Sequence, residues 1–304
     1  GHLKNTLTGI SIVNMLRSQG AQVTVDLINN NRGIAIARLM WGYLEFAKRD
    51  KTLPTDLEYW YMNKEMWHIP ESSSKTPGNF IDDLYTQATE PFKNNPEVES
   101  AVRQMVVDWE AEEPMNRALW KMTQDWVWEG LRTELDELNC WQVDHMWNES
   151  DIYQQGKEHV ERGIKEGYFK RLDDGAVVTD LKKDFNLEDT ILIKRDGTSL
   201  YITQDLELTN LKRQKFNPDE MIWIIGPEQS LAMKQMFAVC SQLGFGKYED
   251  FKHIPYGFVL AAGADGKPTK MSSRAGTSIH VSDLLQQAQA RIESMIQNDD
   301  LSNE

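Results

Sequence analysis

The chain is poor in cysteine and histidine. It has two cysteines and six histidines in 304 residues. Cys140 and Cys240 lie far apart and lack metal-ligand spacing, which argues against a zinc site and for a reducing compartment. The histidines form no i, i+4 pair, so we predict no metal site.

Long apolar runs and a leader are also lacking. No run of about 18 apolar residues occurs, so we expect no transmembrane helix. No basic segment followed by an apolar one marks a targeting peptide. We therefore expect a soluble, cytoplasmic protein. Its length predicts a large layered core with an inserted or appended subdomain.

Positive charge is scarce. Lys and Arg number 33 against 47 Asp and Glu, which gives a net charge of −14. Because phosphate contacts need cations, this sign argues against nucleic-acid binding as the main task of this segment. It fits a cationic small substrate, or RNA affinity that resides in other parts of a longer protein.

A basic, Gly-rich segment spans residues 266–277. It contains Lys270-Met271-Ser272-Ser273-Arg274 between two flexible glycines. An ammonium group, hydroxyls and backbone N–H donors that close over a triphosphate stabilise charge on its pyrophosphate side. The segment therefore predicts ATP chemistry, with Lys270 as the cation. A solvated surface turn is the alternative.

The first residues form a second candidate nucleotide site. Gly1-His2 stands before residues 3–19, which have the apolar spacing of an amphipathic helix. A helix N-terminus has unpaired N–H groups and a positive dipole, which suit a phosphate. A tag remnant is the alternative for Gly1-His2.

Strands and helices alternate in two stretches. The first has a helix at 3–19, a strand at 22–28 and a helix ending near 48. The second has helices at 153–166, from about 205 and at 228–243, with strands at 168–171, 176–181, 190–194, 221–225 and 254–261. This α/β order predicts a doubly wound, parallel, Rossmann-like sheet that binds ligands at the carboxyl ends of its strands.

Residues 51–143 depart from this order. Proline, serine and asparagine are frequent to about residue 96, and helical spacing follows to about 138. Nine of the ten tryptophans fall between Trp41 and Trp147. We predict an inserted, mainly helical subdomain whose tryptophans pack its core, rather than a base-stacking surface. The predicted divisions are 1–50 and 144–262 for the catalytic domain, 51–143 for the insertion, and 263–304 for the basic loop and a helix.

A polar octapeptide at residues 198–205 is the candidate substrate site. Tyr201 and Asp205 lie four apart where a strand is expected to pass into a helix, so they can face one ligand. A capping Asp beside a core Tyr is the alternative.

Together these motifs resemble class I arginyl-tRNA synthetases. Residues 270–274 resemble the Lys-Met-Ser-Lys-Ser loop, and Gly1-His2 resembles the second half of His-x-Gly-His. Residues 198–205 resemble Thr-x-x-Tyr-x-Thr-x-Asp, 144–153 resemble Asp-x-x-x-x-Glu-Ser-x-x-Tyr, and 226–231 resemble Gly-x-Glu-Gln-x-Leu. The likeness covers nearly the whole chain, in order.

The resemblance implies ATP-dependent activation of L-arginine to arginyl-adenylate and its transfer to the 2′-hydroxyl of tRNA(Arg). Mg2+ is expected to accompany the ATP. The protein is expected to be a monomer. The implied site residues fall into three groups. These are catalytic His2, Lys270 and Ser272; arginine-binding Glu149, Tyr201, Asp205 and Gln229; and ATP-binding Gly1, His2, Gly226, Phe258, Val259, Lys270 and Met271.

Several positions depart from the family pattern. Ala232 stands where a His is usual, Asn31-Arg32-Gly33 where many members have Asp-Trp-Gly, and Ser273 and Arg274 alter the basic loop. We expect the first half of the His motif, a tRNA-elbow domain and an anticodon-binding domain outside this sequence. Two alternatives stay open: a truncated arginine- or adenylate-binding module without catalysis, and another class I specificity such as cysteine.

Overall fold

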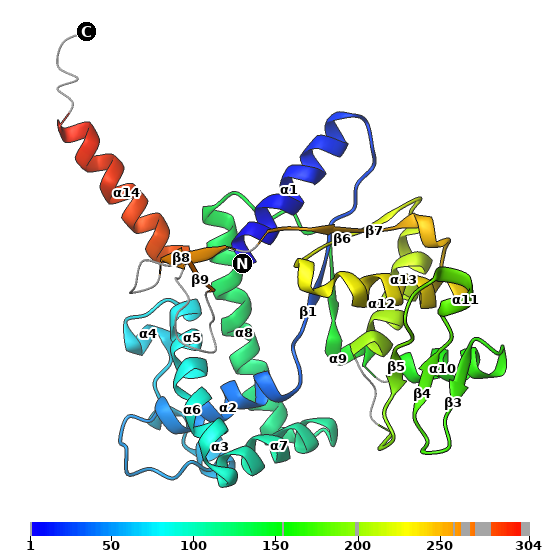
Figure 1. Cartoon of the computed structure of the whole chain (residues 1–304). Coiled ribbons are helices and arrows are strands. Elements are labelled where there is room, and N and C mark those ends of the chain that lie inside the picture. Colours follow the sequence, from blue (N-terminus) through cyan, green and yellow to red (C-terminus); the bar gives the residue numbers. More distant parts are fainter. Residues whose placement is uncertain are drawn as a thin grey trace. The chain divides into compact units, whose positions relative to one another are not determined.

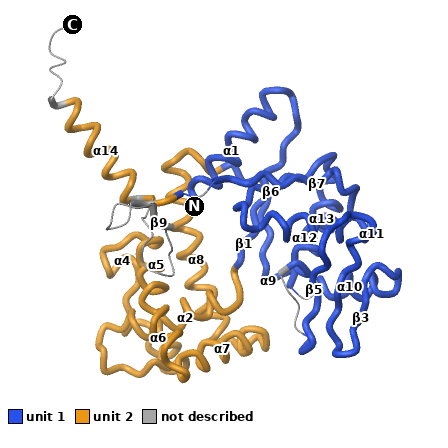
Figure 2. Tube along the Cα trace, viewed as in Figure 1, with its two compact units in different colours: residues 1–30, 142–259 blue, residues 31–141, 260–304 orange. Residues whose placement is uncertain are grey.

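The computed structural model describes residues 2–153, 155–197, 201–257, 259–262, 268–270 and 281–298. The chain forms two compact units, which Figure 2 distinguishes by colour. Unit 1 comprises residues 1–30 and 142–259, and unit 2 comprises residues 31–141 and 260–304. Each unit is described separately below.

Unit 1 contains the alternating helices and strands, which Figure 1 labels. In chain order these are α1 (His2–Ser18), β1 (Asp26–Asn29), β2 (His145–Asn148), α9 (Glu149–Ile152), α10 (Gly156–Lys165), β3 (Phe169–Arg171), β4 (Val177–Thr179), α11 (Lys182–Phe185), β5 (Ile191–Ile193), α12 (Tyr201–Phe216), β6 (Met221–Ile225), η2 (Pro227–Gln229), α13 (Ser230–Gln242), η3 (Tyr248–Asp250) and β7 (Phe251–Pro255).

Two strand pairs of unit 1 are parallel. Strand β1 pairs with β2, with Asn29 opposite Asn148, and β6 pairs with β7, with Ile225 opposite Pro255. Strands β3, β4 and β5 form an antiparallel sheet instead. The predicted α/β class with parallel strands is thus confirmed, while the short strands between α10 and α12 form a separate antiparallel sheet.

Some predicted boundaries are wrong. The strand expected at 22–28 begins only at Asp26, because Arg17 donates to the Val23 carbonyl and the Val25 N–H donates to the Asp144 carboxylate. The strand expected at 254–261 is two strands, β7 and β8. Strand β7 ends at Pro255, which lacks the N–H that a strand ladder needs. The helix expected from Asp205 begins at Tyr201.

Unit 2 is mainly helical. Its elements are α2 (Ile34–Phe46), α3 (Leu57–Met62), η1 (Lys64–Met66), α4 (Pro70–Ser73), α5 (Pro77–Gln87), α6 (Thr89–Asn94), α7 (Pro96–Glu110), α8 (Pro114–Glu137), β8 (Leu260–Ala262), β9 (Pro268–Lys270) and α14 (Val281–Asn298). Helix α2 packs against α5, α7 and α8, so it shares their core. None of the helices in the described ranges is long and apolar enough to cross a membrane.

The tryptophans of unit 2 contribute to its core. Trp60, Trp67 and Trp109 are almost completely buried, and the indole N–H of Trp67 donates to the Leu44 carbonyl at 3.0 Å. For these three the packing role predicted from the sequence is confirmed. Unit 1 has its own core, built from α10, α12, α13 and the strands that they cover.

Candidate functional site

The carboxyl ends of β1 and β2 place one of the predicted carboxylates. The Asn29 side chain donates to the Asn148 side chain at 3.1 Å across the last register pair. Glu149 follows directly as the first residue of α9, and it is 9% exposed. The parallel pairing therefore holds Glu149 at a strand end, where α/β sheets bind ligands.

Asp205 lies on α12, which packs against α9. Burial raises the pKa of the Asp205 carboxyl from 3.8 to about 6, Lys212 opposes the rise, and Glu149 adds to it. Two carboxylates from different elements thus share one poorly solvated region and repel each other. Such a pair gains most from a cation placed between them.

Lys212 stands two turns after Asp205 on the same helix. Its ammonium nitrogen lies 3.0 Å from the Asp26 carboxylate on β1 and 5.2 Å from the ring centre of Trp223 on β6. The indole N–H of Trp147 on β2 donates to the same Asp26 oxygen at 2.7 Å. Sequence reasoning missed this group. The only available signal was the seven-residue spacing that places Lys212 on the same helix face as Asp205.

The start of α12 is fixed by its neighbours. The Thr203 hydroxyl donates to the Leu192 carbonyl at 2.9 Å, and Gly156 of α10 lies so close that a Cβ there would overlap the Thr203 carbonyl oxygen. His159 of α10 contacts the Glu207 carboxylate through its ring Nε2. Tyr201 begins this helix, one turn before Asp205, and its side chain lies outside the described part of the structure.

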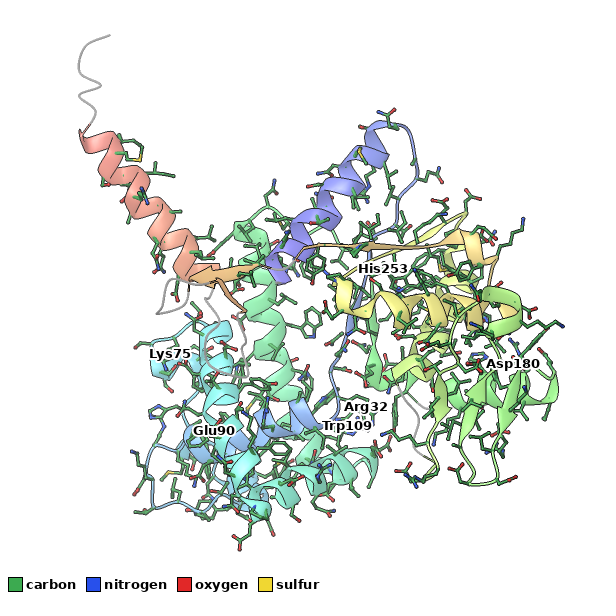
Figure 3. The ribbon with its side chains drawn as sticks, in the orientation of Figure 1. Arg32, Lys75, Glu90, Trp109, Asp180 and His253 are labelled. Carbon is green, nitrogen blue, oxygen red and sulfur yellow. The ribbon has the colours of Figure 1, made fainter. Side chains whose placement is uncertain are left out.

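The carboxyl end of β6 lies beside the start of α1. Asn5 in the first turns of α1 donates to the Ile224 carbonyl at 2.5 Å. His253 on β7, labelled in Figure 3, contacts the Ile225 carbonyl through Nε2 at 3.0 Å, which requires that this nitrogen carries the proton. The beginning of α1 therefore lies beside the end of β6, next to Gly226.

Gly226 opens the turn after β6, and the exposed Gln229 ends it as the last residue of η2. Gln229 thus follows β6, whereas Glu149 follows β2 and Asp205 lies on α12. Val259 is 37% exposed. The Gly257 backbone in the same loop lies near the Lys4 ammonium, which a Cβ there would meet at 3.4 Å. These positions are compatible with a nucleotide between the end of β6 and the start of α1.

Several predicted site residues are described only in part. His2 begins α1 and Lys270 ends β9, with Lys270 opposite Leu260, but their side chains are not described. Gly1, Phe258, Met271 and Ser272 lie outside the described residues.

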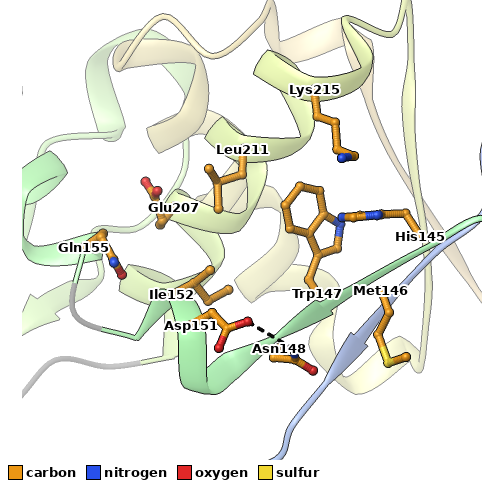
Figure 4. A pocket seen from close by; sticks show the side chains of 10 residues that line it. All are labelled: His145, Met146, Trp147, Asn148, Asp151, Ile152, Gln155, Glu207, Leu211 and Lys215. Carbon is orange, nitrogen blue, oxygen red and sulfur yellow. Dashed lines mark hydrogen bonds between the residues drawn. The ribbon is translucent and has the colours of Figure 1, made fainter.

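A cleft of about 440 Å³ is lined by residues of β2, α9 and α12 (Figure 4). Glu207, Leu211 and Lys215 of α12 line it, so it opens on a different face of the helix from Asp205. The Asn148 amide donates to Asp151 at 3.0 Å along its wall. Glu149, Asp205 and Gln229 do not line this cleft, which is therefore not the predicted arginine site. The remaining lining residues are His145, Met146, Trp147, Ile152 and Gln155.

The turn that departs from the usual Asp-Trp-Gly is built into unit 2. Arg32 forms an ion pair with Glu110, and its guanidinium lies 5.7 Å from the ring centre of Trp109, which Figure 3 labels beside it. The Trp120 indole donates to the Asn31 carbonyl at 2.6 Å. The Arg32 side chain is thus a cation held against an aromatic ring.

The family model described as "tRNA synthetases class I (R), catalytic domain" matches residues 1–303. The chain belongs to this family of class I arginyl-tRNA synthetase catalytic domains.

Its curated relatives share a third of its residues or slightly less. An arginine–tRNA ligase from Treponema denticola is 34% identical over 293 residues, which cover 95% of this chain and 45% of the relative. One from Borrelia hermsii is 31% identical over 292 residues, which cover 94% of this chain and 46% of the relative. The chain therefore spans about half the length of these relatives.

A solved structure supports the fold. A Campylobacter jejuni protein, provisionally named arginyl tRNA synthetase, aligns with a TM-score of 0.57 at 18% identity and covers 93% of this chain and 54% of that one. At this identity the likeness concerns the synthetase catalytic fold.

Proposed function

We propose that this chain is the part of an arginine–tRNA ligase that activates L-arginine with ATP and transfers it to the 2′-hydroxyl of tRNA(Arg). The observation that carries the proposal is the pair Glu149 and Asp205, two carboxylates from separate elements in one poorly solvated region. The names of the relatives support the same reaction.

The carboxylate pair gives the site its preference for a cation. A guanidinium keeps its charge at every working pH and offers N–H donors in a plane, which two carboxylates can accept together. Binding the cation removes the repulsion between Glu149 and Asp205 and favours the ionised form of Asp205. Tyr201 and Gln229 are proposed to contact the rest of the arginine molecule.

The ends of β6 and β7 are proposed to bind ATP. The start of α1, with Gly1 and His2, offers N–H groups to the phosphates, while Gly226, Phe258 and Val259 contact the adenosine part. Lys270, Met271 and Ser272 belong to the loop that meets the pyrophosphate side. The arginine carboxylate attacks the α-phosphorus, pyrophosphate leaves, and the chain stabilises charge without a nucleophile of its own.

Mg2+ is proposed to arrive with the nucleotide. The described residues hold no group of three His, Cys, Asp or Glu side chains that could bind a metal ion. Mg2+ is commonly held through substrate phosphates and one or two carboxylates, so ATP itself supplies most of its ligands.

The finer points of the fold remain part of the proposal. We propose a doubly wound, Rossmann-like catalytic domain at residues 1–50 and 144–262, interrupted by the helical insertion at 51–143 and followed by the loop and helix at 263–304. The parallel pairs β1–β2 and β6–β7 support this arrangement. We further propose a cytoplasmic monomer that meets tRNA(Arg) through the remaining parts of the full-length protein.

Arginine-dependent ATP–pyrophosphate exchange tests the function, measured on the full-length protein with tRNA present. We expect Glu149→Gln and Asp205→Asn to lower kcat/KM for arginine at least about 100-fold, since each leaves a substrate cation without its partner. Asp151→Asn, which alters an exposed carboxylate on the same short helix, is the matched control. Arginine binding without exchange in the unaltered protein would contradict the enzyme function, and exchange driven equally by cysteine would contradict the specificity.

A further inference from the structure

The ammonium group of Lys212 is fixed at the junction of four elements. The Asp26 carboxylate of β1 lies 3.0 Å away, and the Trp223 ring of β6 lies beside it at 5.2 Å. The Trp147 indole of β2 donates to the oxygen of Asp26 that meets Lys212, so it orients this carboxylate toward the ammonium. The exposed fractions of the Lys212 and Asp26 side chains are only 15% and 22%, so solvent screens the pair weakly.

Lys212 and Asp205 lie seven residues apart on the same face of α12, so this ammonium acts on the proposed arginine site through space. Lys212 lowers the pKa of Asp205, against burial and the charge of Glu149, which both raise it. Lys212 forms its ion pair with Asp26 and not with Asp205. The Asp26 carboxylate therefore fixes the ammonium group, and the ammonium group stabilises the ionised form of Asp205.

We propose that Lys212 is a positioning residue of the arginine site: held by Asp26, its ammonium stabilises the negative charge on Asp205, which in turn receives the guanidinium. This inference rests on the proposed arginine site. It adds a residue, Lys212, that the substrate does not contact. It also assigns Asp26 the opposite effect on the pKa of Asp205, because the negative charge of Asp26 weakens the field of Lys212 there.

Other ionisable groups also lie around α12. Glu149 faces Asp205 from α9, and the buried Cys240 thiol faces it from α13. His159 of α10 contacts Glu207, on a different face of α12. His145 of β2 packs its ring against Trp147, with the centroids 4.4 Å apart. Because several ionisable groups lie here, the informative quantity is the difference between variants in the pH midpoint of arginine binding. The pH profile of one protein alone is less informative.

The test measures L-arginine binding by calorimetry between pH 5 and pH 8.5 on the full-length protein. Arginine affinity should fall as the pH drops through the ionisation of Asp205. Lys212→Met keeps the packing over Trp223 but removes the charge, so the midpoint of this fall should move up by about one pH unit, with about tenfold weaker binding near pH 6. Lys212→Arg keeps the charge and should retain the midpoint of the unaltered protein.

Asp26→Asn gives a result that a merely structural role would not. The amide oxygen can still accept from the Trp147 indole, but it no longer offsets the charge of Lys212, so the midpoint should move down. A purely structural junction would weaken binding in both variants without opposite shifts. The KM for ATP should stay unchanged in all three variants.

The outcomes separate the two levels of the proposal. If the unaltered protein binds no arginine, the proposed function fails. If it binds arginine but the midpoints of Lys212→Met and Asp26→Asn coincide with its own, the role of Lys212 is wrong. If Lys212→Met does not fold, the other two variants test the role of Lys212. That role then requires a lower pH midpoint of arginine binding in Asp26→Asn and an unchanged midpoint in Lys212→Arg.

Discussion

The ionised carboxyl of Asp205 is less stable in the folded protein than in the unfolded chain, and a bound cation can make use of this difference. Its carboxyl is poorly solvated and close to Glu149, so its ionised form costs free energy until a cation arrives. Binding sites commonly contain such strained charges, because the ligand relieves them. The same residue therefore links ligand binding to stability.

Asp205→Asn should stabilise the protein without arginine, and more so at higher pH. The folded pKa of about 6 exceeds the unfolded value of 3.8, so the native state binds more protons and unfolding becomes easier as the pH rises between these values. Removing the carboxyl should raise the free energy of unfolding by about 2 kcal/mol more at pH 8 than at pH 4.5.

Urea unfolding at the two pH values measures this difference. Asp151→Asn, which changes an exposed carboxylate on α9, is the control variant. A gain of equal size at both pH values would show that the effect comes from packing rather than from ionisation.

Short motifs gave the proposed roles of Tyr201, Asp205, Glu149 and Gln229. Such motifs can be found in a sequence because the chemistry of a site restricts each position to few residue types. The contact of Lys212 with Asp26 was not predictable in this way. It depends on how β1, β2 and α12 come together, and neither residue stands in a motif. The positions of Glu149 and Asp205 follow from local sequence, while the charge that acts on them follows from tertiary packing.

At the scale of elements, α12 carries Asp205 and Lys212, and α10 packs against it. The backbone of α10 approaches α12 closely at Gly156 and approaches the ring of Phe169 at Gly163. Both glycines permit contacts that a side chain would prevent. They serve different neighbours, because only the contact of Gly156 reaches the first turn of α12.

Gly156→Ala should therefore reduce arginine affinity as well as stability, because the new methyl group must displace the Thr203 carbonyl and with it the turn before Asp205. Gly163→Ala is the matched control. It should cost a similar amount of stability, about 1–3 kcal/mol for overpacking, with arginine affinity preserved in the folded protein. Thermal unfolding and arginine calorimetry measure the two effects. Equal losses of affinity in both variants would contradict this assignment.

Element boundaries were harder to predict than element types. Strand β6 was predicted with its correct bounds because Met221–Ile225 is an apolar run between Asp219-Glu220 and the turn residues Gly226-Pro227. The segment before Asp26 has the composition of a strand, but side chains of Arg17 and Asp144 take its backbone groups. Composition could not reveal this competition, because both partners lie on other parts of the chain.

At the scale of the whole molecule, each unit contains its own core and one buried cysteine. Cys240 belongs to α13 in unit 1, where burial raises the pKa of its thiol well above the usual value. Cys140 is 6% exposed and follows α8 in unit 2. Because a thiol reacts as the thiolate and must reach solvent, each cysteine should be protected until its own unit opens.

Single-cysteine variants should therefore report the opening of the two units separately. With Cys140→Ala the remaining thiol reports unit 1, and with Cys240→Ala it reports unit 2. We expect thiol labelling in increasing urea to give two different midpoints, because the two hydrophobic clusters do not share a residue. Circular dichroism of both variants controls for a change in overall stability. Coincident labelling midpoints would mean that the two units unfold as one cooperative body.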